Sequence, residues 1–279
     1  MNSREPNQNV TLFDESRKGK LLFHYTSLNS AVAILSTRSL LFGQICKLND
    51  MNESWRPIQC THWEDDTIEL CDKELSSYVQ ISLTCEDNPE ATNPKRGFDI
   101  ATMWGHYAEG GNGVCIVLNK GRFLEAISKV PGCHHDYIHY KKDYDCAVLF
   151  ETSNPEEEIS RRITDIFFCK SDQWQYEQEY RIIKKSTGAV NCIDISGCIE
   201  GIIYARLGTT RDGSVYNTKG HWVLEKVCIC NSIPLFGYIP RDLMGNRTLV
   251  RDEDGKAVWS TGEIIDLESG EWKIDKNAE

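Results

Sequence analysis

The sequence predicts an α+β fold in which strands dominate and helices are interspersed. Residues 79–84 (VQISLT) alternate between apolar and polar side chains, which is typical of a half-buried strand. Residues 114–118 (VCIVL) are continuously apolar and indicate a central strand. Ala31, Ile34 and Leu35 recur at helical spacing instead. No three-residue or heptad repeat accompanies these patterns, so a collagen-like or coiled-coil protein is excluded.

The first half of the chain is expected to contain three strands, a capped helix, an acidic helix and a short helical segment. Ser27 or Asn29 precedes the first helix, and either side chain can accept a hydrogen bond from its first turn. Pro, Asn and Gly residues make 86–97 a loop. The expected elements are strands over 21–26, 39–44 and 79–84, an acidic helix over 63–77, and a helical segment over 100–108 that a glycine-rich turn ends.

The second half is expected to contain the central strand at 114–118, further strands and one long helix. Pro155 opens that helix, and three glutamates follow it near the positive end of the helix dipole. Asp254-Gly255 and Ser269-Gly270 each indicate a hairpin turn in a β-rich C-terminal part. The other expected elements are strands over 137–141, 179–183 and 199–205 and a helix over 155–168. The predicted organisation is a polar arm over 1–20, a main domain over 21–230, and a β-rich extension over 231–279 packed on it.

Length and composition describe an ordinary globular protein. The chain has 279 residues, of which 40% are hydrophobic and 26% charged. No run reaches the ~20 apolar residues that a membrane helix needs. The first 20 residues are polar and lack the apolar stretch of a secretory signal. We therefore expect a cytoplasmic protein with no membrane partner.

The charge is negative overall but unevenly distributed. A net charge of −11 disfavours a protein that coats DNA through general electrostatics. Residues 62–90 carry nine acids and one base, whereas residues 120–142 carry five bases and two acids. Residues 181–220 carry six bases and three acids. A local nucleic-acid partner therefore stays possible.

The cysteines are expected to be free thiols. The chain has 12 of them and no Cys-x-x-Cys pair, so neither a zinc ribbon nor a thioredoxin-type motif is visible. Cys85, Cys115 and Cys228 fall in apolar segments that we interpret as strands. The local group of Cys133, His134, His135 and His139 is a poor metal site, because neighbouring histidines rarely bind one ion. No metal is expected.

Two strand segments carry hydroxyl and imidazole groups that could contact a nucleotide. His24 and Thr26 lie two apart, so they face one side of a strand, where both could hydrogen-bond a ribose or an amide. Ser82 and Thr84 share a face in the same way. The alternative is structural. His24 would then satisfy a backbone group, Thr26 or Ser27 would cap the helix, and the two later hydroxyls would lie on a solvated sheet face.

An aromatic segment and a pair of carboxylates are the other candidates. Trp104 and Tyr107 in Met-Trp-Gly-His-Tyr offer flat surfaces for stacking, and both are also ordinary core residues. Glu177 and Glu179 lie two apart where a loop enters a strand, so both could face one site. Close carboxylates separate their proton affinities, which suits acid–base chemistry. A solvated strand edge with Arg181 in an ion pair is the alternative.

The order of these motifs resembles the ADP-ribosyltransferase superfamily. The chain also resembles an uncharacterised bacterial family with a recurring pattern, and toxin-like (DarT-type) transferases of toxin–antitoxin and anti-phage systems. The resemblance covers roughly residues 21 to 205. It departs from the superfamily in having Ser-Leu-Thr in place of Ser-Thr-Ser. The matching segments are His24 to Ser27, Asn49-Asp50 to Glu53, Ser82 to Thr84, Met103 to Ala108, Gly113 to Ile116, and Trp174 to Arg181.

The resemblance implies an ADP-ribosyltransferase-like split β-sandwich that uses NAD as a co-substrate. Glu179 would be catalytic and Glu177 would orient the attacking group, although the two assignments could be exchanged. Tyr107 is preferred to His106 as the residue that stacks on nicotinamide. The residues implied for NAD are His24, Tyr25, Thr26, Ser82, Thr84, Trp104 and Tyr107, and those implied for the substrate are Asn49, Asp50, Glu53 and Arg181. For Arg181, a phosphate contact and an ion pair are both open.

The implied acceptor is a nucleic acid base, in RNA or single-stranded DNA, with an antitoxin protein as a possible partner. Exposed aromatics and basic segments suit stacking and phosphate contacts on a single strand. Net charge alone favours a protein acceptor instead. Two other classes compete with this interpretation: a non-catalytic nucleotide-binding module with structural carboxylates, and a metal-dependent nuclease.

Overall fold

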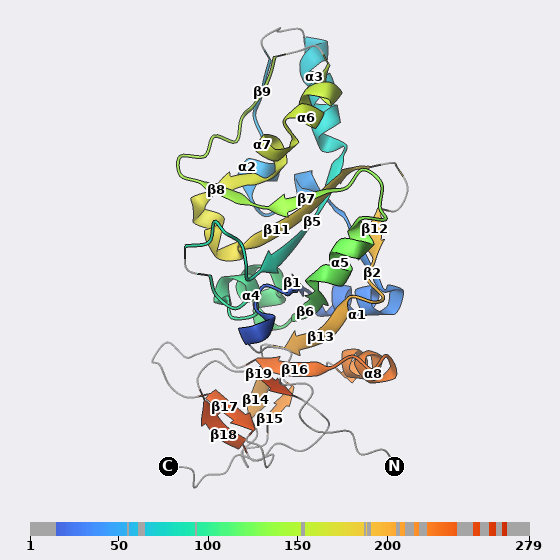
Figure 1. Cartoon of the computed structure of the whole chain (residues 1–279), viewed down its shortest axis with the longest axis vertical. Helices are drawn as coiled ribbons and strands as arrows, with labels where there is room; N and C mark the ends of the chain where they lie inside the picture. The colour runs from blue at the N-terminus through green and yellow to red at the C-terminus, as the bar shows by residue number, and fades with distance from the viewer. Residues whose placement is uncertain are drawn as a thin grey trace. The chain divides into compact units, whose positions relative to one another are not determined.

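A computed structural model divides the chain into two compact units, each assembled from separate stretches of sequence. Unit 1 comprises Met1–Arg38, Lys95–Phe123 and Ile195–Glu279, and unit 2 comprises Ser39–Pro94 and Leu124–Asp194 (Figure 1). Of the predicted N-terminal arm, only residues from 15 onward are described, including η2 (Glu15–Arg17). The structure describes residues 15–54, 56–60, 65–92, 94–151, 154–186, 188, 191–204, 207–209, 215–217, 222–238, 248–251, 257–260 and 264–266.

Unit 1 contains a mixed sheet in the order β19-β16-β13-β6-β1. Strand β6 pairs antiparallel with β1 on one side and with β13 on the other. Residues 114–118 of β6 are completely buried, so the prediction of a central strand is confirmed. The strands are β1 (Leu21–Thr26), β6 (Val114–Asn119), β13 (Ile199–Tyr204), β16 (Leu235–Tyr238) and β19 (Ile264–Asp266).

A crossover helix joins the two parallel strands of unit 1. Strand β16 runs parallel to β13, and a parallel pair needs a long connection. Helix α8 (Trp222–Cys230) lies in that connection. The prediction that Cys228 lies in a strand is wrong: it is a buried residue of α8. Its apolar neighbours were ambiguous, because short apolar runs fit buried helices as well as strands.

The C-terminal part adds strands with hairpin pairing. Strands β17 (Thr248–Arg251) and β18 (Ala257–Ser260) pair antiparallel, as do β14 (Leu207–Thr209) and β15 (Val215–Asn217). The turn expected at Asp254-Gly255 falls between β17 and β18, outside the described residues. The turn expected at Ser269-Gly270 also lies outside them.

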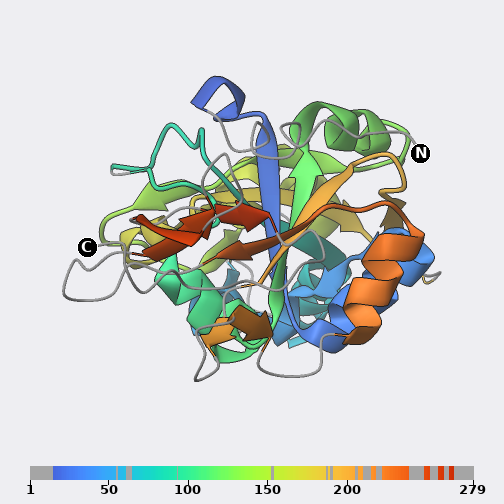
Figure 2. The same cartoon turned by 90° about the horizontal axis from the view of Figure 1, so that it is seen from below.

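The first helix of unit 1 begins after Ser27, one of the two caps that the sequence predicted. Helix α1 (Leu28–Thr37) is capped by Ser27, whose Oγ accepts from the Ser30 N–H at 3.0 Å. Helices α1 and α8 lie side by side in Figures 1 and 2. Gly113 passes so close to β1 that a Cβ there would lie 2.2 Å from the Thr26 carbonyl oxygen. The remaining elements are α4 (Ala101–Tyr107), η4 (Glu109–Gly111) and α5 (Lys120–Ile127), of which α5 crosses the unit boundary.

Unit 2 contains an antiparallel sheet in which β5 pairs with β3 and β11, and β11 pairs with β7. All of β5 is buried except Ser82. The expectation of a half-buried strand is therefore wrong, because the face that carries Gln80 and Thr84 is also covered. The strands are β3 (Gly43–Gln44), β5 (Tyr78–Cys85), β7 (His134–Tyr137) and β11 (Glu179–Lys185).

Three elements predicted as continuous are divided in unit 2. Residues 39–44 form β2 (Ser39–Leu41) and β3, because β2 pairs with β12 (Cys192–Asp194) and β3 with β5. Residues 137–141 likewise divide at the buried Ile138: β7 pairs with β11, while β8 (His139–Lys141) runs parallel to β10 (Cys169–Ser171). The helix over 155–168 is α6 (Pro155–Arg161) and α7 (Ile163–Phe167), separated at Arg162, whose ψ of 22° is not helical.

The apolar core of unit 2 joins its helices to its sheet. Helix α3 (Asp65–Ser76) confirms the predicted acidic helix, and α3 contacts α6 (Figure 1). Strands β4 (Ile58–Cys60) and β9 (Val148–Phe150) form a small parallel pair beside them. The buried cluster is Ile45, Cys60, Cys71, Leu75, Tyr78, Ile138, Val148, Phe150, Ile159, Ile166, Phe167, Phe168 and Ile183. The other short elements are η3 (Ile45–Lys47), α2 (Met51–Ser54) and η5 (Asp172–Glu177).

Candidate functional site

Arg181 is the centre of a buried charged cluster in unit 2. Its side chain lies on β11, is 0% exposed and uses all five of its N–H donors. Nε and Nη2 donate to the two carboxylate oxygens of Glu179, at 2.7 and 2.8 Å. Nη1 and Nη2 donate to the two oxygens of Glu53, and Nη1 also donates to the Phe167 carbonyl at 2.7 Å. Such paired, fork-like bonds fix both carboxylates in position.

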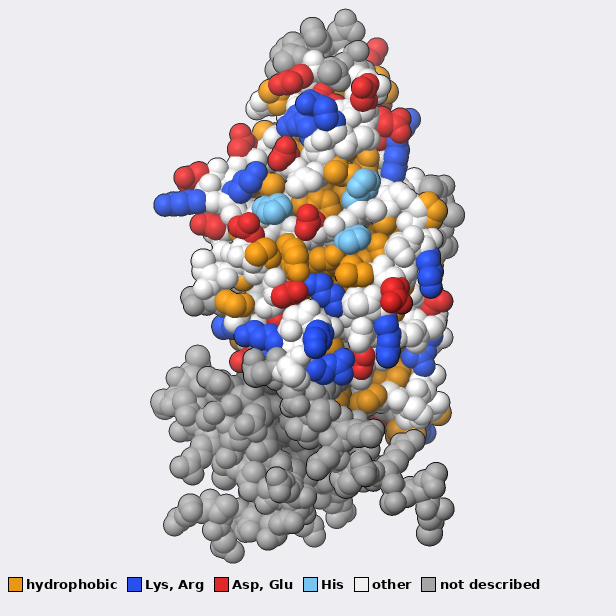
Figure 3. Space-filling view, in the orientation of Figure 1, with side chains coloured by type: hydrophobic (Ala, Val, Ile, Leu, Met, Phe, Trp, Pro, Cys, Tyr) orange, Lys and Arg blue, Asp and Glu red, His pale blue; other side chains and the backbone are white. Residues whose placement is uncertain are grey.

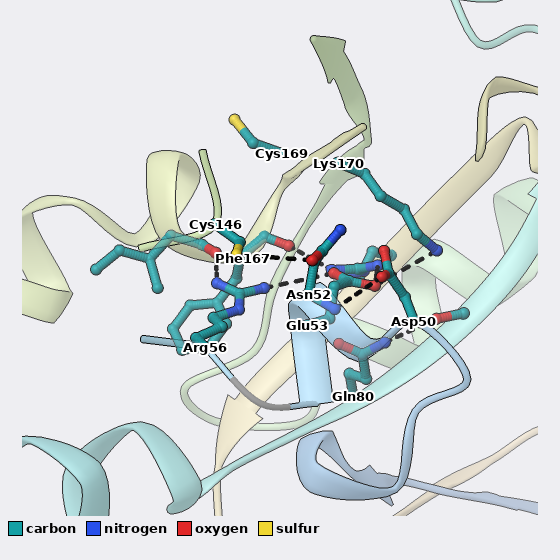
Figure 4. A network of polar contacts seen from close by, with 12 residues as sticks. Asp50, Asn52, Glu53, Arg56, Gln80, Cys146, Phe167, Cys169 and Lys170 are labelled. Carbon is teal, nitrogen blue, oxygen red and sulfur yellow. Dashed lines mark hydrogen bonds and ion pairs between the residues drawn. The ribbon is translucent and has the colours of Figure 1, made fainter. Parts of the chain in front are cut away.

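Lys170 on β10 joins the third carboxylate to the cluster. Its Nζ donates to Glu177 Oε2 at 2.7 Å. The same ammonium lies 3.4 Å from an oxygen of Glu53 and 3.6 Å from one of Glu179. It also lies 4.7 Å from the ring centroid of Trp174. The buried ammonium of Lys170 therefore contacts three buried carboxylates. Figure 4 shows its contact with Glu53.

The cations keep the buried carboxylates ionised. Burial raises the pKa of Glu53, but the charges of Arg181 and Lys170 outweigh it and lower the pKa to about 2. The same competition lowers the pKa of Glu179 from its usual value. Burial lowers the pKa of Lys170, and the three carboxylates overcome this effect and raise it above its ordinary value. Glu53, Glu179 and Lys170 are therefore charged at neutral pH.

Glu177 and Glu179 both lie close to Lys170, although they do not belong to one strand. Glu177 ends the 3₁₀ helix η5, and Gln178 has a positive φ of 48° before Glu179 begins β11. The Gln178 side chain holds this turn, because Nε2 donates to the Cys85 carbonyl at 2.8 Å. The Gln178 carbonyl accepts from the Cys85 N–H at 2.9 Å. The turn therefore orients the carboxylates of Glu177 and Glu179 toward Lys170.

The hydroxyl motif of β5 lies directly opposite the charged motif of β11. In the antiparallel register Thr84 pairs with Glu179, and Ser82 pairs with Arg181. Opposed residues of such a pair project to the same face of the sheet. Thr84 is buried, and its Oγ1 has no hydrogen-bond partner among the described residues. Two of the predicted motifs are therefore neighbours in the fold.

The substrate residues predicted from Asn-Asp-x-x-Glu have different environments. Asn49 is exposed, whereas Asp50 and Glu53 are buried. Asp50 accepts from the Asn52 N–H at 2.9 Å and so caps the short helix α2, which carries Glu53 into the cluster. For Arg181 the structure shows the ion-pair alternative. With every N–H donor occupied, Arg181 offers none to a phosphate.

Two of the predicted NAD residues of unit 1, Tyr25 and Trp104, are buried, and their polar atoms donate hydrogen bonds within the unit. Tyr25 Oη donates to the Gly97 carbonyl at 2.6 Å, and Trp104 Nε1 donates to the Phe98 carbonyl at 2.8 Å. Their rings pack edge to face, with centroids 5.0 Å apart and planes at 86°. Aromatic pairs of this geometry stabilise cores. For Trp104 these contacts match the alternative of an ordinary core residue, and Tyr25 is packed in the same way.

The other unit 1 candidates are more accessible. His24 is half-buried on β1, and Thr26 is buried at its end. Tyr107 is half-buried and His106 is exposed at the C-terminal end of α4. The rings of His106 and Tyr107 lie 6.1 Å apart with an interplanar angle of 76°. Either ring retains surface that could stack on a planar ligand.

Sequence reasoning missed residues that complete the cluster. Lys170, Arg56 and Tyr140 belong to no motif, and they reach the site through pairing of distant segments. Arg56 Nη2 lies 3.4 Å from Glu53 Oε1, and the Glu179 N–H donates to Tyr140 Oη at 2.9 Å. Burial and the charge of Glu179 raise the pKa of Tyr140. A lone lysine in an apolar segment, Phe-Phe-Cys-Lys, was the only sequence signal.

The fold and this cluster define a mixed α/β protein with a network of buried, paired charges. Within the described residues, no group of His, Cys, Asp and Glu has a geometry that could hold a metal ion. No helix in the same part of the chain is both long and apolar enough to cross a membrane.

Comparison with known proteins gives one match. Residues 103–182 match a family described as a protein of unknown function (DUF2971), so the chain contains a domain of that family. Searches of curated proteins and of solved structures gave no match. The matched range contains Trp104, Tyr107, Lys170, Glu177, Glu179 and Arg181, while His24, Glu53, Ser82 and Thr84 precede it.

Proposed function

We propose that the protein is an NAD-dependent ADP-ribosyltransferase with the ADP-ribosyltransferase-like fold, and that it acts as a toxin or anti-phage effector. The observation that carries the proposal is the state of Glu179. Its carboxylate is ionised, oriented by Arg181 through two hydrogen bonds, and placed opposite Thr84 of the Ser-x-Thr motif. A fixed, charged carboxylate can stabilise the cation that develops on ribose when a ribosyl bond is cleaved.

The chemistry assigned to Glu179 is electrostatic. Breaking the bond between nicotinamide and ribose leaves an oxocarbenium-like sugar. A carboxylate that is already charged and oriented stabilises this cation without reorganising. Lys170 holds Glu177 beside it, and Thr84 Oγ1 supplies a hydroxyl that no described residue bonds. In this proposal His24, Tyr25, Thr26, Trp104 and Tyr107 bind NAD, with Tyr107 stacking on nicotinamide.

The proposed acceptor is a nucleic acid base in RNA or single-stranded DNA, and an antitoxin protein is a proposed partner. Figure 3 shows acidic and basic side chains interspersed over the described part of one face, with no continuous basic surface. A nucleic acid would therefore be held by a local stacking contact and not by broad electrostatic attraction.

The test uses the full chain with NAD labelled in its adenylate, incubated with cell lysate separated into protein, RNA and DNA. Wild type should release nicotinamide and transfer label to the nucleic acid fraction. Glu179→Gln should lose at least about 100-fold of both, the effect of removing one transition-state contact. Glu158→Gln is the matched control, because Glu158 is also buried and paired, with Arg162 at 3.0 Å, but lies outside the cluster.

A non-catalytic nucleotide-binding module is the second candidate. The observation that favours it is the burial of Glu177 and Glu179, each engaged by a cation, which suits structural carboxylates. Under this alternative, wild type would bind NAD in equilibrium dialysis and release no nicotinamide. Release by wild type but not by Glu179→Gln would exclude it.

A further inference from the structure

Asp50 lies beside the cluster and differs from its three carboxylates in having an oxygen that none of the described residues bonds. Its Oδ1 accepts from the Asn52 N–H at 2.9 Å, and its backbone carbonyl accepts from the N–H groups of Glu53 and Ser54. Oδ2 has no hydrogen-bond partner among the described residues, although Asp50 is only 4% exposed. A buried oxygen of this kind is costly unless something pairs with it.

Glu53, Glu177 and Glu179 are each bonded by Lys170 or Arg181. No ion pair joins Asp50 to either cation in the described part of the chain. Figure 4 shows Asp50 beside Glu53 and Lys170, at the edge of the same network. Asp50 also adjoins the surface, because Asn49 is exposed and Met51 is 75% exposed.

The groups around Asp50 shift its pKa in opposite directions. Burial raises its pKa, and Glu53 on α2 adds to this effect. The bond from Asn52 and the charges of Lys170 on β10 and Arg181 on β11 lower it, but the net pKa is raised. Tyr176 on η5 is the other titratable neighbour, and burial with the charges of Glu177 and Asp50 raises the pKa of that phenol to about 12. Tyr176 therefore stays neutral at physiological pH.

We propose that Asp50, through Oδ2, is the general base that accepts the proton of the attacking group in ADP-ribose transfer. This inference rests on the transferase proposed above. It replaces the role first expected for Glu177, because Lys170 already holds Glu177 Oε2 at 2.7 Å. A carboxylate paired with a buried ammonium is a weak proton acceptor, whereas Asp50 has a lone pair available.

The step balances without a further reactant. The acceptor is an amino group, such as the exocyclic amine of a base. Its nitrogen forms a bond to the anomeric carbon of the ribose, and the bond from that carbon to nicotinamide breaks. Nicotinamide leaves with the electron pair and becomes neutral. The amine proton passes to Asp50 Oδ2, which later returns it to solvent.

The test compares Asp50→Asn and Asp50→Ser with wild type. Both substitutes retain an acceptor that can cap α2, so the helix should persist. The readouts are label transferred, nicotinamide released and the pH profile of transfer. We expect transfer to fall about 100-fold, and the ratio of label transferred to nicotinamide released to fall with it. The acid limb of the wild-type profile, where Asp50 becomes protonated, should vanish.

Asn154→Ala is the control for loss of a helix cap, because Asn154 caps α6 in the same unit and is exposed. Circular dichroism confirms that each variant is folded. Normal transfer by a folded Asp50 variant, or reduced transfer with the wild-type pH profile, overturns the assignment of Asp50. A wild type that releases no nicotinamide instead overturns the transferase itself, so the two failures are distinguishable.

Discussion

The guanidinium of Arg181 donates hydrogen bonds to both carboxylate oxygens of Glu53, a residue 128 positions away in the sequence. This contact ties the short helix α2 to the centre of β11. It also explains how a four-residue helix, which has little stability of its own, keeps a fixed place in unit 2. The cluster is therefore a structural element as well as a candidate site.

Removing Arg181 should destabilise unit 2 strongly. Arg181→Ala leaves the buried Glu53 and Glu179 short of a partner, and breaking a buried pair costs about 3–5 kcal/mol. Urea unfolding followed by circular dichroism measures the change. Arg161→Ala is the control, since Arg161 is 65% exposed and only 4.0 Å from Glu158, so its loss should be barely measurable. Equal destabilisation by both variants would contradict a stabilising role for the cluster.

Acid should destabilise the protein, because Glu53 becomes protonated. The pKa of Glu53 is depressed in the fold to about 2 from 4.5, so its contribution to stability is fully present above pH 4.5. That contribution is lost as the pH falls from 4.5 towards 2. Urea midpoints measured across this range should decline for wild type. Glu53→Gln should be less stable at neutral pH and decline less steeply, and parallel curves would contradict the prediction.

Substitution of Thr84 tests whether its hydroxyl has a ligand-binding role or a structural role. Thr84→Val removes a buried hydroxyl that has no partner in the described part of the chain, and it keeps the shape of the side chain. Its stability should be unchanged or higher by up to about 1 kcal/mol, because an unpaired buried hydroxyl is unfavourable. Release of nicotinamide should nevertheless decrease if the hydroxyl contacts NAD. A destabilised Thr84→Val would show that the hydroxyl has a partner within the fold.

In unit 1, substitution of Tyr25 tests in the same way whether a predicted NAD residue has a binding role or a structural role. Tyr25→Phe removes the hydrogen bond to the Gly97 carbonyl and should cost about 1 kcal/mol of stability. If Tyr25 is structural, KM for NAD should not change once the variant is folded. A several-fold increase in KM with unchanged stability would instead support the NAD-binding role. Thermal unfolding and initial-rate kinetics distinguish these results.

Local patterns predicted the first residues of helices α1 and α6. Ser27 capped α1 and Pro155 opened α6 as expected, because capping depends on side chains adjacent in sequence. The divisions of 39–44 and 137–141 were missed, because each depends on which distant strand pairs with each half. Cys228 was misassigned for a similar reason, since an apolar run does not show whether it is a helix or a strand.

Residue types alone identified Glu177, Glu179 and Arg181 as members of one group, and the motif order linked them with Ser82 and Thr84. The sequence by itself therefore determined several acidic and hydroxyl residues of the candidate site, and the mixture of strands and helices. Only the tertiary structure decided that Lys170 joins the carboxylates and that Arg181 uses every N–H donor within the fold. It also decided that one oxygen of Asp50 has no hydrogen-bond partner among the residues described. Charge pairing at these distances depends on strand register and on burial, which no local pattern specifies.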